Sequence, residues 1–224
     1  MKRTVLAVLF LSLLGAVSVV PAFADAAIYT DGTSTYNTNA WTINSGYSVS
    51  DSFTVPWNTT VSAVNFVVWM DFGDTLNSVD WSIGTVPFGA TVGATVATGI
   101  VDPTATLISA DNGIPDDAGP DYQIDNEYFS VSPGLSLDTG TTYYLTLDSA
   151  VTAFQVNTDT GTGYVAWDQS NGPSIGTYSP YFEGYPGAPS SFQIIGATPE
   201  PGSFLLLGTG LAGLAGLLRF KFKA

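Results

Sequence analysis

Short stretches in which apolar and polar residues alternate recur along the middle of the chain. Successive side chains of a strand point to opposite faces, so this alternation indicates strands with one buried face. The residues that share a face are Tyr47, Val49, Phe53 and Val55; Val79, Trp81 and Ile83; and Tyr143, Leu145 and Leu147. Residues 61–70 (VSAVNFVVWM) are apolar enough for burial on both faces. Helical periodicity is hard to find between Ala26 and Ile195.

Clusters of Gly, Asn, Asp and Pro separate these stretches, for example at residues 30–35 (TDGTST) and 137–142 (LDTGTT). These residues favour tight turns. Short strands at intervals of roughly 8–12 residues, without interleaved helices, predict an all-β fold, an antiparallel β-sandwich of jelly-roll-like form. We expect this domain to span residues 25–196, with a last strand at Ser191–Ile195.

Composition supports one well-cored domain, because 45% of the 224 residues are hydrophobic and 13% are aromatic. The formal net charge is −14, and all 19 carboxylates lie between Asp25 and Glu200. The basic residues are Lys2, Arg3, Arg219, Lys221 and Lys223. An acidic domain without Lys or Arg repels nucleic acid and anionic lipid, so we expect neither as a partner.

The N-terminus has the three parts of a signal peptide. Lys2 and Arg3 precede an apolar stretch, Val5–Val20, and Ala22-Phe23-Ala24 forms a small-residue cleavage pattern. We therefore expect residues 1–24 to be a signal peptide that signal peptidase cleaves after Ala24. The alternative is a retained membrane anchor, and in both cases the domain is exported.

The C-terminus carries an uncharged apolar run, residues 203–218. As a helix this run spans roughly 24 Å, slightly less than the ~30 Å hydrocarbon core of a bilayer. Arg219, Lys221 and Lys223 follow it, and basic residues that flank a span stay on the cytoplasmic side. The tail is therefore expected to form a marginal transmembrane helix with a basic stop-transfer end.

Pro199, Glu200 and Pro201 precede this run, and the three parts in this order resemble the PEP-CTERM sorting signal. The resemblance implies a transient anchor that exosortase recognises in the inner membrane of a Gram-negative bacterium. It also implies delivery to the outer surface or extracellular matrix, often together with exopolysaccharide. The same tail resembles the C-terminal domain of ice-binding proteins. Phenylalanines interrupt the basic end, where the family commonly has contiguous arginines, and a plain tail anchor is the alternative.

Three other stretches, residues 74–89, 142–152 and 164–174, are similar to ectodomains of PEP-CTERM proteins. That similarity implies one sandwich domain and supplies no substrate or catalytic residue.

The chain contains no Cys and no His, which excludes disulfides, thiolate nucleophiles, imidazole bases and the usual zinc ligands. An acidic stretch at residues 111–127 offers hard oxygen ligands that suit calcium. The candidate ligands are Asp111, Asp116, Asp117, Asp121, Asp125 and Glu127. No EF-hand spacing is present, so the alternative is a solvated acidic loop, and no other cofactor is expected.

A second candidate site is the stretch that ends in a Gly-Pro turn at residues 172–173. Trp167 could offer an exposed ring to a sugar, with Asp168, Gln169 and Asn171 as hydrogen-bond partners. Packing of Trp167 in the core is the alternative. Trp69 and Trp81 lie in strand-like alternation and are expected in the core.

These observations favour an exported, non-catalytic protein of the cell envelope or matrix that is associated with exopolysaccharide. A carbohydrate-binding or ice-binding module is the alternative, although the threonines of residues 30–42 are too irregular for an ice-binding array. A glycoside hydrolase is the third reading, and it would need two carboxyl groups within about 10 Å across a cleft.

Overall fold

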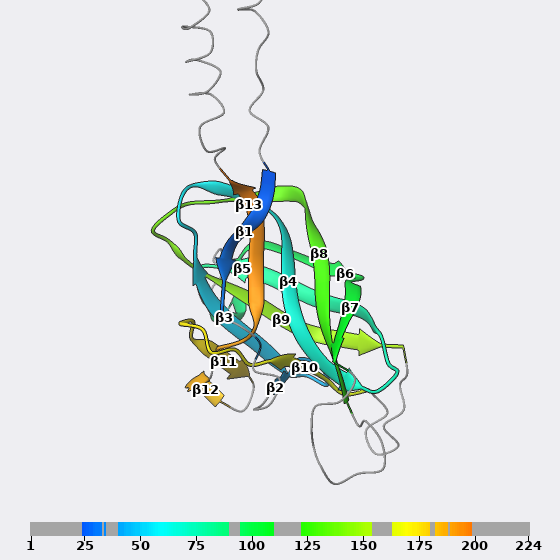
Figure 1. Ribbon diagram of the computed structural model, residues 1–224. Coiled ribbons are helices and arrows are strands. Elements are labelled where there is room, and N and C mark those ends of the chain that lie inside the picture. The colour runs from blue at the N-terminus through cyan, green and yellow to red at the C-terminus, as the bar shows by residue number, and fades with distance from the viewer. Residues whose placement is uncertain are drawn as a thin grey trace, which may run out of the picture. The chain divides into compact units, whose positions relative to one another are not determined.

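The computed structural model is drawn in Figure 1. It describes residues 24–32, 34, 40–89, 95–109, 122–153, 163–179, 182–187 and 189–198. Residues Asp25–Ala197 form one compact unit. Within the described ranges the regular elements are β-strands and one short 3₁₀ turn, η1 (Pro87–Gly89).

The first sheet is organised around the long strand β4 (Thr59–Asp71), whose register with β8 runs from Thr59↔Leu137 to Asp71↔Tyr122. The opposite edge of β4 pairs with two strands in succession, through Phe66↔Phe192 and Val68↔Trp167. The other strands of this sheet are β1 (Ala24–Thr30), β2 (Ala40–Thr42), β7 (Thr104–Ser109), β8 (Tyr122–Leu137), β10 (Val165–Asp168) and β13 (Phe192–Thr198).

The second sheet is also antiparallel, in the order β12-β11-β3-β9-β5-β6. Its strands are β3 (Ser48–Thr54), β5 (Leu76–Gly84), β6 (Thr95–Val101), β9 (Thr142–Thr152), β11 (Gly176–Ser179) and β12 (Phe182–Gly187).

The core lies between the two sheets, where rings from each meet. Phe53 of β3 contacts Phe192 of β13 with a centroid distance of 6.1 Å, and Trp81 of β5 contacts Phe129 of β8 at 5.3 Å. The predicted inward residues of β3, β5 and β9 are buried except Tyr47, which lies just before β3 and is partly buried. Strand β4 buries side chains on both faces. The expected all-β fold with two antiparallel sheets is therefore confirmed. Trp81 is in the core as expected, whereas Trp69 is only half-buried.

The first and last strands of the domain lie next to each other (Figure 1). The amide of Asp31, just after β1, donates to the carbonyl of Phe192 at the start of β13 (2.9 Å), so the two strands run in opposite directions. The start of β1 and the end of β13 consequently lie at the same end of the sheet.

Strand β13 begins at Phe192, one residue after the start of the predicted last strand, and continues beyond its predicted end to Thr198. Its extension is held by the Thr59 hydroxyl, which donates to the carbonyl of Ala197 (2.8 Å). Gly196 allows this close approach, because a Cβ there would lie 2.7 Å from the carbonyl oxygen of Thr60.

No helix in the described part of the chain is long and apolar enough to cross a membrane. Of the expected signal peptide, residues 1–24, only Ala24 is described, and it begins β1. The expected membrane span at residues 203–218 and the basic end lie outside the described residues.

Candidate functional site

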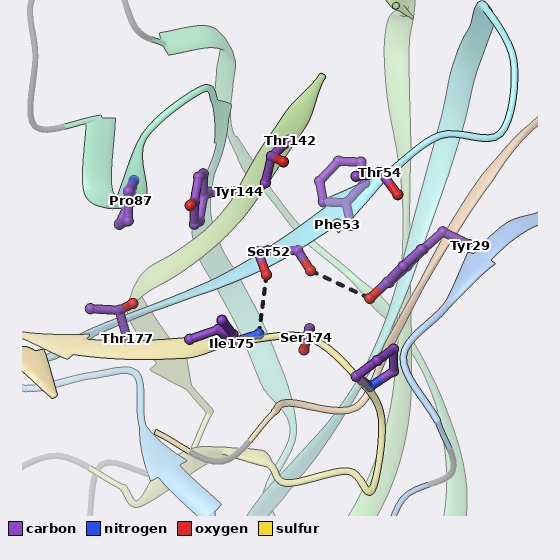
Figure 2. Close-up of a pocket in the computed structure, with 11 residues that line it drawn as sticks. Tyr29, Ser52, Phe53, Thr54, Pro87, Thr142, Tyr144, Ser174, Ile175 and Thr177 are labelled. Carbon is purple, nitrogen blue, oxygen red and sulfur yellow. Dashed lines mark hydrogen bonds between the residues drawn. The ribbon is translucent and has the colours of Figure 1, made fainter. Parts of the chain in front are cut away.

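An open groove of about 540 Å³ lies over the outer face of the second sheet (Figure 2). Its lining residues are Tyr29, Ser52, Phe53, Thr54, Pro87, Thr142, Tyr144, Pro173, Ser174, Ile175 and Thr177. None of them is charged, and seven carry a hydroxyl group, namely Tyr29, Ser52, Thr54, Thr142, Tyr144, Ser174 and Thr177. The groove is therefore a neutral surface rich in hydrogen-bonding groups.

Strand alternation places most of these hydroxyls. Because Phe53 and Tyr143 point into the core, their neighbours in β3 and β9 point outward. The antiparallel register puts Ser52 opposite Tyr144 and Thr54 opposite Thr142, so two cross-strand pairs form the floor of the groove. The Pro173–Ile175 segment forms one wall, where the amide of Ile175 donates to the Ser52 hydroxyl oxygen (3.1 Å).

A fully buried carboxylate, Asp31, holds that wall in place through Ser174. It accepts hydrogen bonds from the hydroxyls of Tyr29 (2.9 Å), Ser170 (2.8 Å) and Ser174 (2.7 Å), and from the amide of Ser174 (3.1 Å). Burial and the nearby charge of Asp31 raise the pKa of Tyr29, which keeps its phenol protonated. Since the hydroxyls of Tyr29 and Ser174 donate hydrogen bonds to Asp31, their oxygens can accept hydrogen bonds from a ligand in the groove.

Two further buried aspartates, Asp51 and Asp168, accept hydrogen bonds from neighbouring segments of the chain. Asp51 accepts from the amides of Ser52 (2.7 Å) and Ser190 (2.5 Å), and burial raises its pKa to about 7. Asp168 accepts from the indole of Trp69 (2.7 Å) and from the Ser34 hydroxyl. The chain has no Lys or Arg between Thr4 and Leu218, so neutral donors compensate these carboxyl groups.

The prediction of an exposed sugar platform at Trp167 is wrong. Trp167 is fully buried, its indole donates to the carbonyl of Ser191 (2.9 Å), and its ring packs edge-on against Phe192. The reason is that β10 pairs with β4 on one side and β2 on the other and is buried on both faces. Asp168 and Gln169 are buried as well, and of the predicted group only Asn171 is exposed.

Of the predicted calcium ligands, Asp111, Asp116, Asp117 and Asp121 lie outside the described residues. The other two, Asp125 and Glu127, are buried on the inner face of β8. Gln123 donates to Asp125 (2.7 Å), whereas both carboxylate oxygens of Glu127 lack a hydrogen-bond partner among the described residues. Burial, followed by the charges of Asp125 and Asp102, raises the pKa of Glu127 to about 7.

The described ranges contain no group of three or more Asp or Glu residues arranged to hold a metal ion. Asp125 and Glu127 alone supply too few ligands for calcium, which takes roughly six to eight oxygens. Calcium binding by the acidic stretch therefore remains a prediction that concerns its other four aspartates.

A row of hydroxyl residues crosses the second sheet near the groove. The register joins Thr177, Ser50, Thr146, Ser82 and Thr98 on adjacent strands. Ser50 and Thr146 are buried, and the hydroxyl of Thr146 donates to that of Ser50 (2.9 Å). The middle of the row is thus closed to solvent, unlike the exposed flat array that ice binding would need.

The groove was missed in the sequence because its residues come from separate segments around residues 29, 52–54, 87, 142–144 and 173–177. One signal was present, since the outward positions of β3 and β9 are mostly Ser or Thr.

Comparison with known families identifies a sorting motif in the C-terminal segment. The family model of the PEP-CTERM protein-sorting motif matches residues 197–219. This chain carries a PEP-CTERM sorting motif. It is therefore an exported protein that exosortase sorts to the cell surface. In a separate comparison with curated proteins, none matches the chain.

Proposed function

We propose that this PEP-CTERM protein is a non-catalytic component of the cell envelope or extracellular matrix, associated with exopolysaccharide. The observation that carries the proposal is the sorting motif at residues 197–219, which begins within β13 of the sandwich. In this proposal signal peptidase removes residues 1–24. The tail then holds the protein transiently in the inner membrane of a Gram-negative bacterium until exosortase acts.

The adjacency of β1 and β13 supports a simple mode of display. The start of β1 and the end of β13 lie at the same end of the first sheet, so in this proposal the mature domain is attached to the envelope or matrix through that end.

The carboxyl groups described above favour a non-catalytic role. Asp31, Asp51 and Asp168 are fully buried and accept hydrogen bonds that fix loops. The lining of the groove contains no carboxyl group, whereas a glycoside hydrolase needs a facing pair. A carbohydrate-binding module is the second candidate function, and the neutral, hydroxyl-lined groove favours it over an ice-binding module.

Processing tests the proposal directly. Intact-mass analysis of protein recovered from the cell surface should show a chain that lacks residues 1–24 and the basic end from Arg219 to Ala224. The Pro201→Ala variant should accumulate unprocessed in the inner membrane, because the recognition motif is lost while the span remains. Pro56→Ala, at an exposed turn, is the matched control and should be processed normally. Surface protein with an intact C-terminus would contradict the proposal.

A further inference from the structure

Four hydroxyl groups in the groove have no hydrogen-bond partner within the part of the chain that the structure describes. They belong to Thr54, Thr142, Tyr144 and Thr177, which come from β3, β9 and β11. A hydroxyl can donate one hydrogen bond and accept two, so these groups are available to a ligand.

The ring of Tyr144 is placed to contact a ligand through its face. Tyr144 is half-buried and lies between Ser52 of β3 and Gly84 of β5 in the register of the sheet. Gly84 adds no side chain beside the ring, and Pro87 lines the groove together with Tyr144 (Figure 2). Aromatic rings with a polar tip suit a ligand that is apolar on one face and polar at its edge.

The opposite side of the groove provides acceptors of fixed orientation. Tyr29 and Ser174 are held by the buried Asp31, which accepts a hydrogen bond from each hydroxyl. Ser52 receives a hydrogen bond from the amide of Ile175 and can donate its own proton. The groove thus combines preorganised acceptors, adaptable hydroxyls and one aromatic ring, all without charge.

We propose that this groove binds an uncharged polysaccharide chain, with Tyr144 stacking on a sugar ring and the surrounding hydroxyls bonding to the hydroxyls of the sugars. The proposal rests on the matrix association proposed above and names the class of ligand and its site. The volume of the groove, about 540 Å³, falls within the roughly 300–1,000 Å³ of small-ligand sites.

Charge and position in the sheet select this ligand over others. A chain with 19 carboxylates and no Lys or Arg near the groove would repel sulfated or uronic polysaccharides. A peptide commonly binds by adding a strand to a sheet edge, which pairs its backbone groups. The floor of this groove is the outer face of β3 and β9, both interior strands of the second sheet, where a ligand meets side chains and not the backbone groups of a strand edge.

Binding can be measured by titration calorimetry of the full chain in detergent. The probes are neutral gluco-, galacto-, manno- and xylo-hexasaccharides, with an alginate hexasaccharide as the anionic probe. At least one neutral probe should bind at millimolar concentration or below, and alginate should not. Tyr144→Ala should weaken binding by about tenfold or more, and Thr142→Val, which removes only a hydroxyl, should also weaken it.

Tyr128→Ala is the matched control, because Tyr128 is exposed on β8 of the other sheet. This variant should bind like the wild type, and a melting curve of each variant confirms that it is folded. Absence of binding to every neutral probe, equal binding of alginate, or full binding by both groove variants would overturn the proposal. Correct processing of the tail without sugar binding would refute the groove alone. Sugar binding, together with surface protein that keeps its C-terminus, would refute the sorting proposal alone.

Discussion

The carboxyl group of Glu127 is buried in the interior of the sandwich, which is unusual for a charged residue type. It lies on the inner face of β8, in register with Phe66 of β4, and neither oxygen has a hydrogen-bond partner among the described residues. Burying an unpaired charge is costly, so such a group stays protonated to higher pH. This cost is the physical cause of the raised pKa of Glu127. Burial raises the pKa of Asp51 to about 7 in the same way.

Stability should therefore fall as pH rises from about 4 to about 7. In the unfolded chain these carboxyls ionise near pH 4, whereas in the folded protein Asp51 and Glu127 ionise near pH 7. Between these values the folded state binds more protons, and a rise in pH favours unfolding. The melting temperature should be higher at pH 5 than at pH 8.

Substitution separates the effect of Glu127 from the general effect of a negative surface. Glu127→Gln removes the ionisation, so it should raise the melting temperature at pH 8 and reduce the slope against pH. Asp138→Asn, at an exposed turn, removes a carboxyl without altering a buried group and should leave the slope nearly unchanged. A Glu127→Gln variant that kept the wild-type slope would show that this carboxyl is not buried as described.

At the scale of elements, Trp167 joins two strands that meet along one edge of β4. Its ring lies against Phe192 of β13, and its indole donates to the carbonyl of Ser191. Trp167→Ala should destabilise the domain by about 3–5 kcal/mol, as should Trp81→Ala, because each leaves a large cavity. Trp57→Ala should cost less, since Trp57 is only partly buried. Urea unfolding measures all three, and a Trp167→Ala variant as stable as the wild type would contradict the buried placement.

The strands could be predicted because one face of each is apolar. Val79, Trp81 and Ile83 alternate with polar residues, and the structure buries all three. Asp51 lies on the same inward face, between Val49 and Phe53, and an apolar pattern does not by itself reveal a buried carboxyl at such a position.

The candidate site depends on contacts between distant segments, which a local pattern does not contain. Trp167 follows Val165 and Ala166 in a strand buried on both faces, and this burial depends on its pairing with β2 and β4. The groove depends on the register that sets Ser52 beside Tyr144 and on the loop that brings Ser174 to Asp31. Neither register nor loop path follows from hydrophobic periodicity alone.

At the scale of the whole molecule, the carboxylates have no cationic side chains to pair with between Asp25 and Ala197. Some face each other directly, as Asp80 and Asp148 do across β5 and β9. Burial and the charge of Asp148 raise the pKa of Asp80. Like charges opposite each other in a sheet are destabilising, so this protein depends on its solvent ions more than a charge-balanced domain would.

Salt should therefore stabilise the folded protein. Raising sodium chloride from about 0.01 M to about 0.5 M shortens the screening length from about 30 Å to well under 10 Å. The melting temperature at pH 8 should rise by several degrees as repulsion among the carboxylates is screened.

Calcium adds a second test, because a divalent ion that binds only the folded form stabilises it by mass action. If the acidic stretch at residues 111–121 binds calcium, millimolar calcium should raise the melting temperature more than magnesium at equal ionic strength. Asp116→Asn with Asp117→Asn should abolish that difference, while Asp80→Asn should leave it intact. Equal shifts for the two ions would assign the whole effect to screening and remove the calcium site.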